Sequence, residues 1–187
     1  MEQGELLENR LINYTVANSN YEEHRSYIGL SKISEPAEKL AQLYKSNQSA
    51  DVKTKLKCYK GYQMEADIID RLKKIYLNRI NIEKTITAYD GLVQGHPDGW
   101  LDDFPLDVKS VLCDDWIPET KLPTRIYWQM QGYLLYARKE KAFVIFESRE
   151  NGIIRVKTIT PNYSIQKAID EKLRKTIQLI KSGNAHA

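Results

Sequence analysis

Three carboxylates and one lysine are spaced in a way that could build a site for hydrolysis. Asp98 lies in a Gly-His-Pro-Asp-Gly stretch at 95–99, whose glycines permit tight turns and whose proline fixes one backbone dihedral. Nine residues later, Asp107 and Lys109 flank Val108, so on a strand both would point to one face and Val108 to the other. Each pattern also has an ordinary explanation: Pro-Asp-Gly is a common turn, and Asp-x-Lys can form a surface ion pair.

The third carboxylate, Glu65, lies in a long helix predicted at about 53–76. On a helical wheel, Glu65 falls in the middle of an apolar stripe. The stripe consists of Ile68, Ile69, Leu72 and Ile75. A carboxylate on an inward face is costly unless it is paired or binds a metal. A buried salt bridge to a lysine of the sheet is the structural alternative.

Together these side chains predict a metal site. A helix carboxylate, a turn aspartate and a strand Asp-x-Lys can converge at one end of a sheet and surround a cation with oxygen atoms. Mg²⁺ favours such hard oxygen ligands. A lysine beside the cation can orient a water molecule or stabilise charge that develops on a phosphate.

A second polar group follows one edge of a helix predicted at about 124–138. Gln129 and Tyr133 are one turn apart, and Arg125 precedes Gln129 by another turn, so the three share a face. Tyr136 is expected nearby on the same edge. A cation, an amide and phenols suit contacts with phosphates and bases. The alternative is a polar rim around a core helix.

The order of helical and strand patterns predicts an α/β layered domain with a central mixed β-sheet flanked by helices. Strands are expected at 80–89, 91–94, 104–112, 142–148 and 152–160, and helices at 34–44, 53–76, 124–138 and 163–181. A chain of 187 residues suits one hydrophobic core. We therefore expect one domain at 1–187, with an N-terminal helical extension at 1–50, a catalytic core at 53–160 and a C-terminal helix at 163–182.

Charge is distributed unevenly along the chain. Residues 121–187 carry 13 Lys and Arg against 5 Asp and Glu, whereas residues 1–120 carry 15 against 20. A basic half favours a polyanionic partner, and an acidic half could hold cations. A solvated charged surface is the other explanation.

Composition excludes several classes of protein. Only Cys58 and Cys113 are present, so one chain can build neither a disulfide framework nor an all-cysteine metal site, and a reduced cytoplasmic setting is expected. No run approaches the ~20 apolar residues of a membrane span. The acidic, polar stretch at 1–10 does not have the pattern of a secretory signal.

The ordered motifs resemble the PD-(D/E)XK nuclease superfamily, here as Pro97-Asp98 followed by Asp107-Val108-Lys109. They are most similar to the RecB-like, phage-type exonuclease branch. Its Gly-x-x-x-Glu helix, Gly-His-x-Asp-Gly turn and Gln-x-x-x-Tyr helix match residues 61–65, 95–99 and 129–133. A looser likeness covers about 27–160 and includes Tyr-Ile-Gly-Leu-Ser at 27–31. One departure is Asp107, where many relatives have Glu.

The resemblance implies a restriction-endonuclease-like core and a DNA exonuclease that depends on Mg²⁺ or Mn²⁺. Asp98 and Asp107 would bind the main metal with the carbonyl of Val108. His96 could add a ligand, and Glu65 would hold a second metal or its water.

Lys109 would position the attacking water or help to deprotonate it, and Arg125, Gln129 and Tyr133 would contact nucleic acid. DNA, single- or double-stranded, is the expected partner, in recombination, repair or phage DNA processing. A recombination or CRISPR-type protein is a further candidate partner. Several relatives carry an iron–sulfur cluster on four cysteines; with two cysteines, none is expected here. A structure-specific endonuclease and an inactive nucleic-acid-binding module on the same fold remain alternatives.

Overall fold

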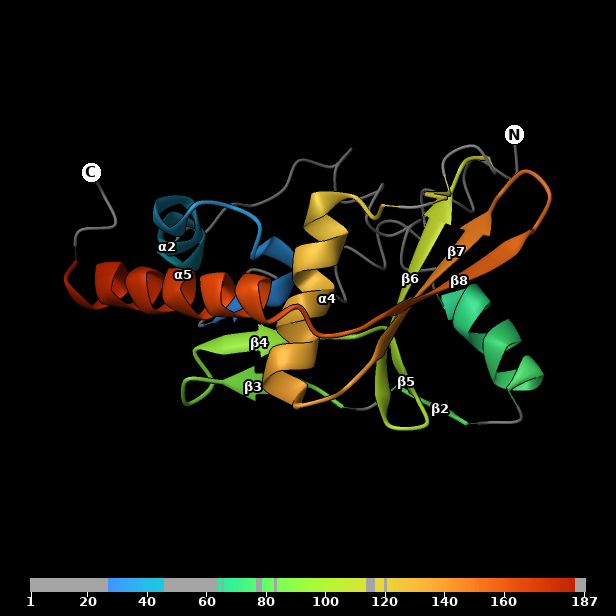
Figure 1. Ribbon diagram of the computed structural model, residues 1–187, viewed down its shortest axis with the longest axis horizontal. Coiled ribbons are helices and arrows are strands. Elements are labelled where there is room, and N and C mark those ends of the chain that lie inside the picture. The colour runs from blue at the N-terminus through green and yellow to red at the C-terminus, as the bar shows by residue number, and fades with distance from the viewer. Residues whose placement is uncertain are drawn as a thin grey trace, which may run out of the picture.

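The computed structural model describes residues 27–45, 64, 66–76, 79–82, 84–113, 117–119 and 121–183. These residues form the predicted α/β architecture, with a five-stranded sheet in the order β2-β5-β6-β7-β8 and a three-stranded sheet in the order β1-β4-β3. Helices cover both faces of the larger sheet (Figure 1). Within the described residues, no helix combines the length and apolar character needed to cross a membrane.

The larger sheet is mixed. Its strands are β2 (Ile80–Asn81), β5 (Gly99–Leu101), β6 (Phe104–Val111), β7 (Ala142–Ser148) and β8 (Ile154–Ile159). The central strands β6 and β7 pair in parallel, and all other neighbours pair antiparallel. β6 thus has a partner along each edge, and its position and register are defined on both sides.

The two faces of β6 serve different layers. Val108 is fully buried, and together with Ile145 it packs against the helix of residues 66–75. In Figure 1 this helix and α4 lie on opposite sides of the sheet. Asp107 and Lys109 lie on the opposite face, as the alternation predicts. The apolar stripe of the helix at 66–75 ends one turn earlier than predicted, because Ile75 is 61% exposed.

The smaller sheet holds the segment at 27–32 beside the turn at 95–99. It contains β1 (Ile28–Gly29), β3 (Ile86–Ala88) and β4 (Val93–Gly95), with β1 parallel and β3 antiparallel to β4. A 3₁₀ turn, η2 (Leu30–Lys32), follows β1 and packs against α4.

Three helices complete the layer on the Asp107 side. They are α2 (Ala37–Lys45), α4 (Thr124–Ala137) and α5 (Tyr163–Lys181). The side chain of Asn162 caps α5 by accepting a 3.1 Å hydrogen bond from the backbone N–H of Ile165. α4 ends at Arg138 in a left-handed conformation.

The prediction of a single strand at 80–89 is wrong. The structure divides it into β2 and β3, which belong to different sheets. Ile80 enters the core under the helix of residues 66–75, whereas Ile86 enters the core under α4. Between them, the carbonyl of Lys84 accepts a 2.9 Å hydrogen bond from the Trp100 indole, which attaches the connecting segment to β5.

Gly95→Ala tests how closely α4 packs on β4. A Cβ atom at Gly95 would lie 2.7 Å from Cε1 of Tyr133 and 2.8 Å from Cδ1 of Leu30. Because overpacking a tight core typically costs about 1–3 kcal/mol, we expect urea unfolding to show a loss of that size. Gly29→Ala is the control, since its nearest neighbour is Oγ of Ser31 at 3.7 Å. Equal stability of the Gly95→Ala variant and the parent protein would contradict the close packing.

Candidate active site

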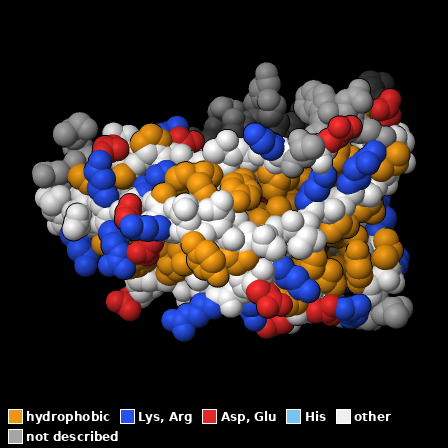
Figure 2. Space-filling model, in the orientation of Figure 1, with side chains coloured by type: hydrophobic (Ala, Val, Ile, Leu, Met, Phe, Trp, Pro, Cys, Tyr) orange, Lys and Arg blue, Asp and Glu red, His pale blue; other side chains and the backbone are white. Residues whose placement is uncertain are grey.

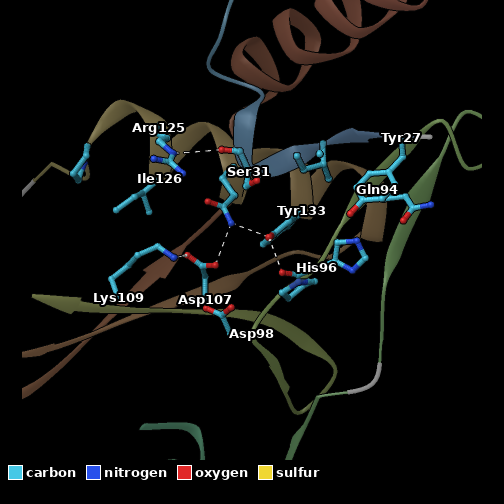
Figure 3. A pocket seen from close by; sticks show the side chains of 15 residues that line it. Tyr27, Ser31, Gln94, His96, Asp98, Asp107, Lys109, Arg125, Ile126 and Tyr133 are labelled. Carbon is cyan, nitrogen blue, oxygen red and sulfur yellow. Dashed lines mark hydrogen bonds and ion pairs between the residues drawn. The ribbon is translucent and has the colours of Figure 1, made fainter. Parts of the chain in front are cut away.

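A pocket of about 760 Å³ opens between β6, the end of β4 and the first half of α4. It brings together most of the side chains predicted from the sequence, as Figure 3 shows. These are His96, Asp98, Asp107, Lys109, Arg125, Gln129 and Tyr133. Residues separated by up to 37 positions in the chain therefore share one cavity.

Asp107 is the buried centre of this group. Only 2% of its side chain is exposed, against 28% for Lys109, and Nζ of Lys109 lies 2.5 Å from Oδ2 of Asp107. Oδ1 accepts a 3.1 Å hydrogen bond from Nε2 of Gln129. Oδ2 has the ammonium of Lys109 as its partner and accepts no other hydrogen bond among the described residues. Oδ2 is therefore a buried acceptor with a single charged partner in the described part of the chain.

Asp98 ties the turn to the central strand. Its Oδ2 accepts a 2.6 Å hydrogen bond from the backbone N–H of Val108. The carbonyl of Val108 accepts a 3.1 Å hydrogen bond from Nζ of Lys109. Because β5 begins at Gly99 and pairs with β6, the turn places Asp98 beside the strand that carries Asp107.

Gln129 and Tyr133 support the carboxylate from α4. Nε2 of Gln129 also donates to the Tyr133 hydroxyl at 2.8 Å, and that hydroxyl donates to the carbonyl of His96 at 3.1 Å. Tyr133 is only 1% exposed, and burial together with the charge of Asp107 raises its pKa well above the usual range, so the phenol keeps its proton. This hydroxyl is therefore engaged in hydrogen bonds within the protein, and contact of Arg125, Gln129 and Tyr133 with nucleic acid stays a prediction.

The polar edge of α4 that lines the pocket is shorter than the helical wheel predicts. The hydroxyl of Tyr136 donates to Oδ1 of Asp170 on α5, as does that of Tyr89. Tyr136 therefore joins the contact between helices and does not line the pocket. Arg125 remains at the pocket, where its Nε donates to the carbonyl of Ser31 at 3.4 Å.

His96 is exposed and meets Tyr27 edge to face, with ring centroids 5.6 Å apart. Its Nδ1 lies 3.4 Å from Oγ1 of Thr85. In Figure 3 the imidazole points towards Tyr27 and away from Asp98 and Asp107. Metal ligation by His96 stays a prediction.

Glu65 and the Gly-x-x-x-Glu motif at 61–65 lie outside the described residues. Within the described part, no cluster of three or more His, Cys, Asp and Glu side chains is placed to hold a metal ion. The oxygen atoms present still fit a hard cation: the buried carboxylate of Asp107, the carboxylate of Asp98 and the carbonyl of Val108. Metal binding thus stays a prediction that the donor set favours.

Among the lining residues with polar side chains, three were not predicted as site residues: Tyr27, Ser31 and Gln94. The parallel pairing of Gly29 with Gln94 brings the segment at 27–31 to the pocket. Strands of two or three residues carry too little periodicity to be found in a sequence. The only available signal was the loose family likeness at 27–31.

The charge asymmetry is partly neutralised by folding. Lys139 forms an ion pair with Asp103, and Lys175 pairs with Glu38, so basic residues of the C-terminal half meet acidic residues of the N-terminal half. On the face seen in Figure 2, basic and acidic side chains alternate around the rim and form no single basic patch. A polyanionic partner for the basic half of the sequence therefore stays a prediction.

No family model matches the sequence, and no curated protein matches it. Solved structures do match. SSO0001 has a TM-score of 0.60 at 15% identity over 96% of this chain and 88% of its own. The alkaline exonuclease LHK-Exo from Laribacter hongkongensis, in complex with dAMP, has a TM-score of 0.63 at 11% identity over 87% and 91%. A phage-related exonuclease from Haemophilus somnus 129PT has a TM-score of 0.54 at 14% identity over 83% and 96%. At such low identity the similarity shows the fold, and the chain has the fold of these exonucleases.

Proposed function

We propose that this protein is a divalent-metal-dependent deoxyribonuclease of the PD-(D/E)XK type that hydrolyses phosphodiester bonds from a DNA end. The observation that carries the proposal is the buried Asp107, whose Oδ2 is paired with Lys109 and accepts no other hydrogen bond among the described residues, beside Asp98 in an open pocket. The exonuclease fold supports it, as does the dAMP bound by one structural neighbour.

Mg²⁺ or Mn²⁺ would be held by Asp98, Asp107 and the carbonyl of Val108, with Glu65 as a further predicted ligand. The imidazole of His96 points towards Tyr27 and would have to turn to join them. When bound, such an ion polarises a phosphate oxygen and makes a coordinated water molecule more acidic. Gln129 holds Oδ1 of Asp107 and thereby fixes the direction of Oδ2. These contacts thus position the proposed oxygen ligands in the absence of DNA.

Lys109 supplies the positive group nearest the proposed chemistry. Its ammonium is held between Oδ2 of Asp107 and the carbonyl of Val108, at the wall of the pocket. A fixed donor there can orient the attacking water or stabilise charge on the phosphate without reorganisation. Arg125 at the rim would bind a neighbouring phosphate.

The function is tested with end-labelled linear DNA and covalently closed single-stranded circles, each with Mg²⁺, Mn²⁺ or EDTA. We expect metal-dependent shortening of linear DNA and intact circles, because an exonuclease needs an end. Cleaved circles would identify an endonuclease instead. DNA binding without any cleavage would indicate an inactive binding module.

Lys109→Ala provides the inactive comparison in the same assay. Loss of one donor to a developing charge costs about 100-fold or more in turnover, while DNA affinity should stay unchanged. Lys167→Ala is the control, because its side chain is 79% exposed and lies on α5 away from the pocket. Parental turnover in Lys109→Ala would remove this lysine from the mechanism.

Asp107→Asn separates metal binding from cleavage. The change keeps the size of the side chain and removes its charge, so Mn²⁺ should raise the melting temperature of the parent protein but not of the variant. An ion at a hundred times its Kd stabilises a folded protein by about 2.7 kcal/mol. Asp70→Asn is the matched control on an exposed helix face, where 71% of the side chain is accessible. An equal response to Mn²⁺ in Asp107→Asn would refute this ligand.

Tyr133→Phe tests the support from α4. The variant loses hydrogen bonds to Gln129 and His96, which costs about 0.5–1.5 kcal/mol of stability for each bond. Turnover at saturating DNA should fall with it, because Gln129 then holds Asp107 less firmly. Tyr136→Phe removes a hydroxyl of the same helix outside the pocket, so it should lower stability alone. A parental rate in Tyr133→Phe would show that the link does not position Asp107.

A further inference from the structure

The pocket has two chemically different sides. Asp98, Asp107, Lys109 and Arg125 bring charge to one side. The side away from Asp107 and Lys109 presents the neutral polar or aromatic groups of Tyr27, Gln94 and His96, which Figure 3 shows together. A nucleotide is divided in the same way, into a charged phosphate and an uncharged aromatic base.

The two rings on this neutral side are arranged to receive a flat group. Tyr27 and His96 meet edge to face at 5.6 Å with an interplanar angle of 61°. In such a pair, each ring keeps a face that its partner does not cover. Tyr27 is half-buried and His96 is exposed, and both line the pocket, so these rings are not consumed by the hydrophobic core.

The backbone holds this aromatic side firmly relative to the carboxylates. Tyr27 directly precedes β1, which pairs with β4, and Gln94 is fixed in β4 by that pairing and by the hydrogen bond from its Nε2 to the carbonyl of Gly91 at 3.3 Å. The carbonyl of His96 is linked through Tyr133 and Gln129 to Oδ1 of Asp107. The backbone that carries the His96 ring is therefore joined to the proposed reaction centre by three consecutive hydrogen bonds.

The size of the cavity points to the same kind of ligand. A volume of about 760 Å³ lies within the range of pockets that enclose a small molecule, about 300–1,000 Å³. A pocket of this size can take one or two nucleotides of an unpaired strand, whereas an intact duplex would remain outside.

We propose that Tyr27 and His96 form a nucleobase-binding subsite, in which an unpaired base stacks while the phosphate of the same strand lies at Asp107 and Lys109. This inference rests on the proposed function for the identity of the ligand and adds where the base is held. Stacking tolerates every base, because each has a π face, so the subsite selects for an unpaired nucleotide and not for a sequence. A duplex end must then open before its strand can enter.

The test measures binding in EDTA, where cleavage plays no part. Fluorescent single-stranded hexanucleotides carry one abasic nucleotide at each position in turn, and anisotropy gives the Kd for each. Stacking of one base on an aromatic side chain corresponds to roughly 5- to 150-fold in affinity. We expect a loss of this size in the parent protein at one position or at two neighbouring positions.

Tyr27→Ala should abolish that position dependence while leaving the affinity for the most weakly bound abasic oligonucleotide unchanged. Tyr27→Phe keeps the ring and should behave like the parent protein. Tyr163→Ala removes an 81% exposed tyrosine at the start of α5 and is the control. Equal Kd values at all positions in the parent protein, or position dependence that survives in Tyr27→Ala, would overturn the subsite. Position-dependent binding in a protein that cleaves no DNA would uphold the subsite and refute the nuclease.

Discussion

The site depends on burying the carboxylate of Asp107 between β6 and α4. A charge taken out of water is costly unless it is paired and hydrogen-bonded, and here Gln129 and Lys109 offset that cost. Both partners require a particular register of β6. A slip by one residue would send Asp107 into the core under the helix of residues 66–75 and bring Val108 into the pocket. The parallel pairing with β7 and the antiparallel pairing with β5 prevent that slip.

The turn at 95–99 is joined to this carboxylate from two directions. Asp98 accepts a hydrogen bond from the backbone of Val108, and the carbonyl of His96 accepts one from Tyr133. Gly95 leaves room for Tyr133 to approach that closely. The turn, the strand and α4 are consequently joined by hydrogen bonds on each side of the carboxylate. The contact with Tyr133 also holds the backbone of His96, whose ring meets Tyr27 at the neutral side of the pocket.

Sequence patterns predict the long elements well and the short ones poorly. α5 begins and ends where its amphipathic pattern does, and β7 spans the predicted 142–148, because many residues repeat one signal. β1 and β5 were not predicted as strands, since two or three residues carry too little periodicity and are defined as strands by their pairing, β1 with the distant β4 and β5 with β2 and β6. The difference in burial along α4 could not be predicted for a related reason. A helical wheel places Arg125 and Tyr133 on one face, but only Tyr133 packs beside Leu30 and Gly95, which are distant in sequence. The convergence of Asp98, Asp107 and Lys109 was predictable because alternation and turn chemistry are local.

An ordinary ion pair does not explain the contact between Asp107 and Lys109. Surface pairs are exposed on both sides and contribute about 0–1 kcal/mol, whereas here the carboxylate is 2% exposed and the ammonium 28%. A buried pair is commonly no more stabilising than apolar residues of the same volume, so the fold alone has no need of one at this position. The oxygen that faces Lys109 accepts no other hydrogen bond among the described residues, and the carboxylate lies at a cavity. A charged pair that is costly to bury and lies at a pocket is accounted for by chemistry at that pocket, which the proposed nuclease reaction supplies.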